Sequence, residues 1–138
     1  MDLDAARDFL RTHHRSVLAT TRRDGRPQLS PVTHAVGDDG RVLLSSREPA
    51  YKVRNARRNP AVSLLVISDS WYGEWVQVDG TADIVSLPDA MELLVDYYRR
   101  AAGEHPDWDE YRAAMVADRR LVLTLRPERA YGLGVGAG

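Results

Sequence analysis

Two Asp-Gly pairs, each set between runs of strand-forming residues, constrain the fold of this chain most strongly. The first, at 24–25, joins an expected strand over Ser16–Thr21 to another over Pro27–Val36. The second, at 39–40, leads into an expected strand over Arg41–Ser46. Asp-Gly between such runs is a strong signal for a tight hairpin, so the sequence predicts consecutive antiparallel strands.

Three further segments have the pattern of strands. Ala61–Ile67 is apolar on both faces, as expected of a central strand. Glu74–Val85 alternates between apolar and polar residues, and Arg120–Arg126 places three leucines on one face. Short, hairpin-linked strands with alternating patterns are typical of a small barrel. No Gly-x-Gly-x-x-Gly follows a strand, which argues against a dinucleotide-binding sheet.

Four helices are expected between or beside these strands. Residues 3–12 are amphipathic, and an arginine-rich helix over about 48–58 ends at Asn59-Pro60. Ser86 to Asp89 has the form of a capping box that opens a helix to about Ala102, and Asp107 to Glu110 repeats the spacing for a helix to about Asp118. The 138 residues fit one domain, 1–138, of the α+β class and mainly β.

Composition excludes several classes of function. The net charge of −1 recruits neither nucleic acid nor an anionic membrane. The chain has no cysteine, which removes disulfides, thiolate nucleophiles and cysteine-based metal sites. No apolar run approaches the roughly 18 residues of a membrane span, and the acidic N-terminus lacks a signal pattern. We therefore expect a cytoplasmic protein.

Hydrolytic or metal-dependent machinery is hard to find in this sequence. The four histidines lack metal-ligand spacing, no Gly-x-Ser-x-Gly elbow is present, and the acids are scattered or sit at caps and turns. We assign no metal ligand and no catalytic acid or base. A haem would need an axial histidine, and only His34 lies on an expected strand.

Lys52 is the only lysine among 19 basic residues. It follows a strand end with two hydroxyls, Ser45 and Ser46, and falls in the first turns of the expected helix. Free N–H groups at a helix start, hydroxyls and one ammonium make a good phosphate site. Asn55 is three residues on, and we expect it to share the face of Lys52. A solvated basic surface helix has the same composition, so both interpretations stay open.

Trp75 is the second unusual residue. It falls on the otherwise polar face of its strand, just after Trp71 and Tyr72. An aromatic side chain there needs cover from a ligand, a loop or another subunit. Packing beneath the predicted helix pair is the alternative.

Three motifs carry a resemblance to a known family. GRPQLSP after the first Asp-Gly, LLSSREPAYKVRNARRNP, and EHPDWDEYRAAMVADRR together resemble the pyridoxamine-5'-phosphate-oxidase-like superfamily over roughly residues 8–133. Within it they look like the branch of small oxidoreductases that use the deazaflavin coenzyme F420. The resemblance implies a six-stranded antiparallel split β-barrel (the FMN-binding split barrel) with flanking helices. It also implies a homodimer with two cofactor grooves at the interface.

The resemblance also implies roles for particular residues. Those that match cofactor-binding positions are Ser30, Pro31, Val32 and Thr33 beside the ring system, Ser45 and Ser46 near the ring or ribityl chain, Lys52 at the phosphate with support from Asn55, and Trp75 lining the cofactor from a neighbouring strand. One position departs from the pattern. Flavin-using oxidases commonly have an arginine beside the phosphate lysine, and this chain has Tyr51. Arg47 or Arg54 is then a candidate substitute.

The implied activity is hydride transfer between the deazaflavin and a small organic substrate that the sequence does not identify. The closest alternative is an FMN-dependent oxidase or reductase on the same barrel. The non-enzymatic alternative is a barrel that carries a cofactor or haem without turnover.

Overall fold

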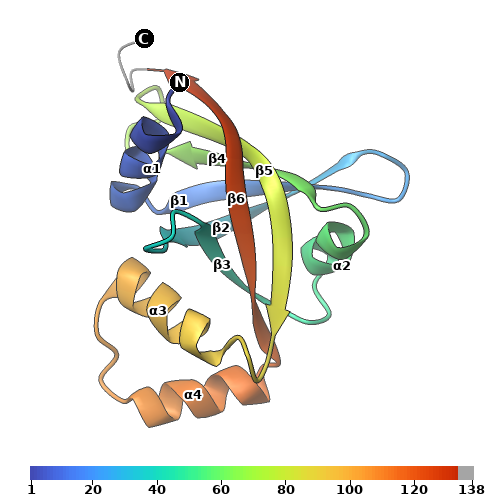
Figure 1. Cartoon of the computed structure of the whole chain (residues 1–138), viewed down its shortest axis with the longest axis vertical. Helices are drawn as coiled ribbons and strands as arrows, with labels where there is room; N and C mark the ends of the chain where they lie inside the picture. The colour runs from blue at the N-terminus through green and yellow to red at the C-terminus, as the bar shows by residue number, and fades with distance from the viewer. Residues whose placement is uncertain (134–138) are drawn as a thin grey trace.

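Six strands close into an antiparallel barrel in the order β1-β2-β3-β6-β5-β4 (Figure 1). A computed structural model describes residues 1–133. The strands are β1 (Arg15–Thr21), β2 (Pro27–Val36), β3 (Val42–Arg47), β4 (Ala61–Ile67), β5 (Trp75–Ser86) and β6 (Arg120–Leu133). The predicted six-stranded split barrel of the α+β class is therefore confirmed.

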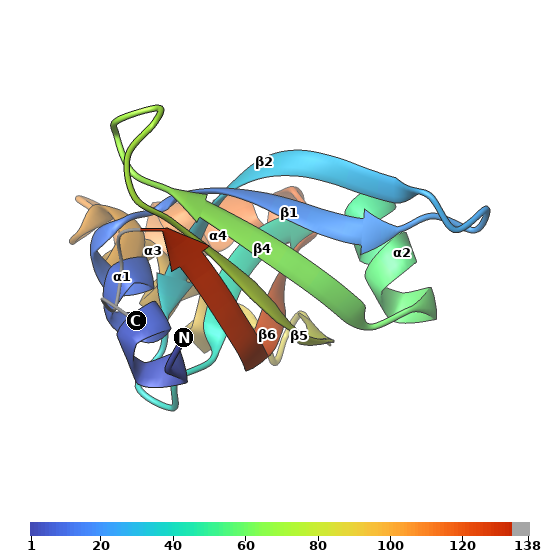
Figure 2. The same ribbon diagram turned by 90° about the horizontal axis from the view of Figure 1, so that it is seen from above.

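Four helices surround the barrel, and their places differ (Figures 1 and 2). Helix α1 (Leu3–Thr12) lies near the end of the barrel where β6 finishes, and α2 (Tyr51–Arg58) lies on the side from which the β1–β2 hairpin projects. Helices α3 (Met91–Ala102) and α4 (Trp108–Ala117) pack together at the opposite end from α1. Two hydrophobic cores result.

The larger core fills the barrel, and the smaller one lies under the helix pair. Leu18, Leu64 and Leu125 are fully buried in the first. Leu94 and Val122 are fully buried in the second, where Val122 faces α3 from the outside of the barrel. The helix pair thus covers one part of the outer surface of the sheet, while residues of α1 and α2 pack into the larger core.

The barrel is split between β2 and β3. These strands pair only over 34–36 and 42–44, and beyond this point β2 continues beside β1 while β3 continues beside β6. Pro31 lies in the middle of the unpaired part of β2. Its partner Val17 is at a non-hydrogen-bonded position, so the missing N–H of the proline faces the split and costs β1 no hydrogen bond.

Both predicted hairpin turns are present. Gly25 and Gly40 have φ values of +87° and +83°, a region that glycine adopts without strain. The predicted helix start at Asp107 is also confirmed, because the side chain of Asp107 accepts a hydrogen bond from the N–H of Glu110 at 3.1 Å. The reciprocal bond of a capping box is replaced by one from the N–H of Asp107 to Nδ1 of His105 at 2.9 Å.

Three predicted boundaries are wrong. Ser86 caps no helix: it ends β5, its hydroxyl donates to Glu48, and α3 begins only at Met91. Residues 48–50 form the turn that precedes α2. Strand β6 continues past 126 to Leu133, because a bulge at Asp79/Gly80 lets β5 keep pairing beyond Pro127. A Cβ on Gly80 would lie 2.1 Å from the carbonyl oxygen of Arg126, so the bulge requires glycine.

Candidate functional site

A hollow of about 370 Å³ opens where β3 ends and α2 begins. We call it the lysine hollow, and its lining residues are Ser45, Ser46, Arg47, Pro49, Ala50, Lys52 and Arg120. It brings together three of the predicted cofactor ligands, Ser45, Ser46 and Lys52. The cap residue of α2 is Ala50, which has no side chain to bond the first N–H groups of the helix. Those donors remain available to a ligand.

The electrostatics of the lysine hollow favour an anion. Burial lowers the pKa of Lys52, and the positive charge of Arg120 lowers it further. Lys52 forms no ion pair with any acid among residues 1–133. A partly desolvated cation with no counter-charge is costly, and a bound anion relieves that cost.

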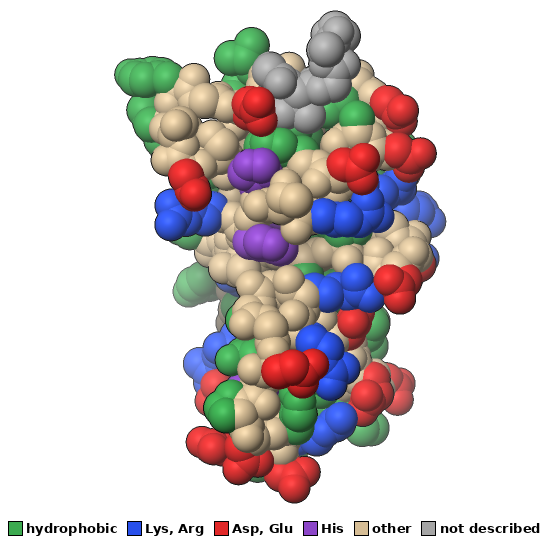
Figure 3. All heavy atoms as spheres, turned by 90° about the vertical axis from the view of Figure 1, so that its left-hand side faces the viewer, with side chains coloured by type: hydrophobic (Ala, Val, Ile, Leu, Met, Phe, Trp, Pro, Cys, Tyr) green, Lys and Arg blue, Asp and Glu red, His purple; other side chains and the backbone are tan. Residues whose placement is uncertain are grey.

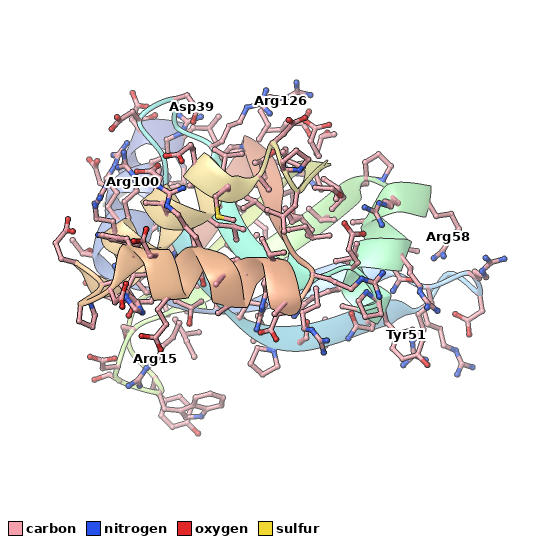
Figure 4. The ribbon with its side chains drawn as sticks, turned by 90° about the horizontal axis from the view of Figure 1, so that it is seen from below. Arg15, Asp39, Tyr51, Arg58, Arg100 and Arg126 are labelled. Carbon is pink, nitrogen blue, oxygen red and sulfur yellow. The ribbon has the colours of Figure 1, made fainter. Side chains whose placement is uncertain are left out.

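A second hollow, of about 670 Å³, lies between α2 and the β1–β2 hairpin. We call it the arginine hollow, and it is lined by Arg22, Arg23, Asp24, Gln28, Tyr51, Arg54, Asn55 and Arg58. Figure 4 shows Tyr51 and Arg58 at this end of the molecule. None of its four arginines forms an ion pair within residues 1–133. The hollow is therefore strongly cationic.

Asn55 lies in the arginine hollow and does not line the hollow of Lys52. Its amide N–H donates to the hydroxyl of Thr20 at 3.2 Å, and its amide oxygen accepts from Arg58 at 3.1 Å. The side chain is buried, at 8% exposure. The structure thus gives Asn55 a role in holding α2 against β1, and its contact with a cofactor stays a prediction.

The predicted residues of β2 lie along the split, but they face opposite ways. Ser30 and Val32 point inward, whereas Pro31 and Thr33 are exposed on the outer face. The hydroxyl of Ser30 is buried and has no hydrogen-bond partner among the described residues. On the outer side, the hydroxyl of Tyr97 in α3 donates to the carbonyl oxygen of Thr33 at 2.9 Å. The split therefore offers polar groups on both sides.

Trp75 lies on a broad outer face formed by β2, β1, β4, β5 and β6. Two rows of paired residues define this outer face: Thr33, Arg15, Ile67, Trp75 and Leu133, and beside it Pro31, Val17, Leu65, Gln77 and Tyr131. Trp75 packs edge-on against Tyr131, at 5.8 Å between ring centroids. Three strand spacings separate Trp75 from Thr33, a distance of roughly 14 Å. Trp75 and the split therefore lie apart within one chain.

His34 is buried and fully engaged. Its Nε2 contacts the carbonyl oxygen of Leu10 at 3.0 Å and its Nδ1 contacts the hydroxyl of Ser16 at 2.8 Å. Burial lowers the pKa of His34 to about 4, with smaller contributions from His14 and His13. Neither ring nitrogen is free, so His34 as placed is unsuited to bind a haem iron.

The surface elsewhere is balanced in charge. On the face shown in Figure 3, basic and acidic side chains lie intermixed. Within residues 1–133, no cluster of three or more histidines and acids is arranged to hold a metal ion. No helix in that part of the chain has the length and apolar character needed to cross a bilayer.

Residues 3–134 match the family model described as pyridoxamine 5'-phosphate oxidase. The chain belongs to this family. The match covers both hollows, the split and the outer face. The resemblance inferred from the three sequence motifs is thus confirmed at the level of the family.

Solved structures with the fold of the pyridoxamine 5'-phosphate oxidase family agree with this assignment. The conserved hypothetical protein Rv2991 from Mycobacterium tuberculosis is 27% identical, with a TM-score of 0.78 over 96% of this chain and 84% of its own. An F420 reductase is 26% identical, with a TM-score of 0.69 over 90% of this chain and 94% of its own. A haem-binding protein from Mycobacterium smegmatis, at 21% identity and a TM-score of 0.71 over 99% of this chain and 55% of its own, shares the fold.

Proposed function

We propose that this protein is an F420-dependent oxidoreductase that transfers a hydride between the deazaflavin and a small organic substrate. The observation that carries the proposal is the lysine hollow. It combines Lys52, Arg120, two serine hydroxyls and the unbonded N–H groups of α2 at one end of the split. That donor set suits a phosphate ester.

The split suits the rest of such a cofactor. The orphaned hydroxyl of Ser30 and the open backbone edge of β2 supply hydrogen-bond partners to a polar ring system. Pro31 and Thr33 give that edge an exposed outer side. A cofactor held by its phosphate in the lysine hollow would place its ring along β2.

The arginine hollow favours F420 over FMN. Both cofactors have a tricyclic ring and a ribityl phosphate, and beyond the phosphate F420 continues as a lactyl-polyglutamate tail. Tyr51 and Lys52 are adjacent at the start of α2, and each lines a different hollow. The two hollows therefore flank the first turn of α2. A tail that leaves the phosphate site would reach four arginines that form no ion pair within residues 1–133, although one acid, Asp24, lines the same hollow.

We also propose a homodimer, because residues 1–133 leave the outer face without cover. Leu133 is 59% exposed there and pairs with Trp75, and Leu29 of β2 is 61% exposed on the same side of the sheet. A two-fold interface on this face would bury it in both copies. The resemblance implies that Trp75 lines the cofactor from a neighbouring strand, and because Trp75 is distant from the split within one chain, we propose that it does so from the second copy.

In this proposal the cofactor, when bound, supplies the hydride chemistry, and the protein supplies position and electrostatics. Lys52 holds the phosphate, and Tyr97 fixes the edge of β2 through Thr33. Tyr97 is half-buried, and burial raises its pKa, so its hydroxyl stays a hydrogen-bond donor at neutral pH. We assign none of these groups as an essential acid or base.

The test is a comparison of cofactors on the purified protein. Fluorescence titration gives the dissociation constants of F420 and FMN, and a peroxide assay follows the reduced cofactor in air. We expect tighter binding of F420 and no steady peroxide. Tighter binding of FMN with continuous peroxide release would instead make this an FMN-dependent oxidase on the same barrel.

The dimer has its own test. Light scattering should give twice the 15.5 kDa mass of the chain at micromolar concentration. A Leu65→Asp variant places a charge in the middle of the outer face and should shift the mass to that of a monomer. Arg112→Ala, on exposed α4, is the matched control that keeps the dimer. A monomeric wild type would remove the shared site from the proposal.

A further inference from the structure

Arg120 is a cation of the lysine hollow whose charge is largely unsatisfied within the chain. It is the first residue of β6 and lies directly opposite Arg47 of β3. Like charges at directly opposed positions of an antiparallel pair repel each other. Arg47 donates from Nε to the carbonyl oxygen of Asp118 at 3.0 Å, whereas Nε of Arg120 is buried without a hydrogen-bond partner among the described residues.

One acid lies nearby, and it does not neutralise the hollow. The carboxylate of Asp118 is 3.7 Å from Nε of Arg120, and its side chain is 53% exposed. An exposed ion pair of that length contributes little. Against it stand three cations, Lys52, Arg47 and Arg120, which line the same space. An arginine stays charged in proteins, so the hollow cannot relieve the repulsion by losing the proton of Arg120.

The positions of Lys52 and Arg120 are complementary. Lys52 enters from α2 and Arg120 enters from β6, so the two side chains approach the hollow from different elements. The ammonium is a compact point charge, and the guanidinium is a planar fork that matches two oxygens of one phosphate. Tyr51, the neighbour of Lys52 in sequence, is 75% exposed and lines the arginine hollow instead.

We propose that Arg120 is the second cationic ligand of the anion that binds in the lysine hollow. This inference rests on the proposed function, in which that anion is the phosphate of the cofactor. Arg120 then fills the role for which the resemblance makes Arg47 or Arg54 the candidate. Arg47 also lines the lysine hollow, but its Nε already donates to the carbonyl oxygen of Asp118, and Arg54 lines the arginine hollow.

The experiment compares a ligand that carries the phosphate with one that lacks it. F420 and its phosphate-free fragment, 8-hydroxy-5-deazariboflavin, are titrated by fluorescence into the wild type, Arg120→Gln and Arg120→Lys. Arg126→Gln is the control, because Arg126 lies on the same strand, is exposed and contacts Glu128 at 3.8 Å. Circular dichroism verifies that each variant is folded.

We expect Arg120→Gln to weaken F420 binding about 10- to 100-fold, as for the loss of a charge-assisted hydrogen bond. Affinity for the phosphate-free fragment should not change. Arg120→Lys should retain part of the affinity because it keeps the positive charge. It should not retain all of it, because lysine lacks the planar guanidinium that donates two hydrogen bonds to one phosphate. Arg126→Gln should match the wild type for both ligands.

Three other outcomes separate this inference from the proposed function. Equal loss of both ligands in Arg120→Gln would show a structural role and overturn the inference. Unchanged F420 binding in Arg120→Gln, together with weakened binding in Lys52→Ala, would overturn it and leave the proposed function standing. A wild type that binds neither deazaflavins nor FMN would overturn both.

Discussion

Arginines on two sides of this barrel have opposite surroundings. In a hollow of about 570 Å³ between α3 and the outer surface of β3, β5 and β6, Arg41 contacts Asp39 and Asp83, and Arg100 contacts Asp38 and Asp96. We call this hollow the acidic wedge. Figure 4 shows Asp39 and Arg100 together at this side, away from Tyr51 and Arg58. The arginine hollow has no comparable ion pair in the described part of the chain.

The difference separates arginines that stabilise the fold through ion pairs from cations whose charge is free to bind a ligand. In the acidic wedge every arginine is matched inside the chain, and the pKa of Arg100 is raised by its bonds to Asp38 and Asp96. Lys52 and the four arginines of the arginine hollow lack such partners among residues 1–133, and the pKa of Lys52 is lowered. The hydroxyl of Thr124 in the acidic wedge also has no hydrogen-bond partner among the described residues, but a neutral group costs far less to bury than a charge.

The largest expected effect is on ligand binding at Lys52. We expect Lys52→Ala to keep the fold and to weaken F420 binding about 10- to 100-fold, because a hydrogen bond to a charged group contributes about 1.5–3 kcal/mol. Fluorescence titration measures it. The matched change in the acidic wedge, Arg41→Ala, should leave binding unchanged. Unchanged affinity in a folded Lys52→Ala variant would mean that Lys52 does not bind the cofactor and is a solvated surface residue.

The next largest effect is on the stability of the fold. It comes from His34, a buried side chain whose two ring nitrogens both have hydrogen-bond partners within the chain. The pKa of His34 is about 4 in the fold, below its ordinary value of 6.5, mainly because of burial. Between these values the unfolded chain holds the extra proton, so stability falls as the pH falls. One such group loses about 2 kcal/mol of folding free energy between about pH 7 and pH 5.

Urea unfolding across this pH range measures the loss, and an NMR titration of the His34 ring identifies its source. His34→Gln should flatten the dependence, because it removes the titrating group. A His34 resonance that titrates near its ordinary pKa would contradict the assignment even if stability declines.

The sequence predicts the barrel well because hairpin turns and strand alternation are local signals. It also places Lys52 beside Ser45 and Ser46, since a strand end followed by a helix start is a local arrangement. The role of Arg120 could not be found this way, because β6 meets β3 only in the closed sheet. Asn55 shows the other limit: spacing of three on a helix indicates a shared face, but the packing of α2 against β1 decides where that face points.

The contrast between the two regions also predicts opposite effects on the stability of the ligand-free protein. Lys52→Met removes an uncompensated cation and should stabilise the fold by a few tenths of a kcal/mol, up to about 1 kcal/mol. Arg100→Met strands two aspartates and should destabilise it by about 0.5–1 kcal/mol. Urea unfolding without cofactor compares the two. Destabilisation by both variants would mean that Lys52 has a partner within the chain.

The smallest effect concerns the tail of F420 and the arginines of α2. Arg54 and Arg58 line the arginine hollow, whereas Arg57 contacts Glu48 at 3.0 Å and donates to Ser86. We therefore expect Arg54→Gln and Arg58→Gln to weaken F420 binding by about 0–1 kcal/mol each, and Arg57→Gln to have no effect on it. FMN has no tail, so its affinity should be the same in all three variants.

Screening by salt should reduce the difference in affinity between F420 and FMN, because exposed charges interact less at high ionic strength. The measurement is a titration of both cofactors at two salt concentrations, with F420 of shorter and longer tails as a further comparison. An F420 affinity that depends on neither salt nor tail length would limit recognition to the lysine hollow, and the arginines of α2 would then form a solvated face.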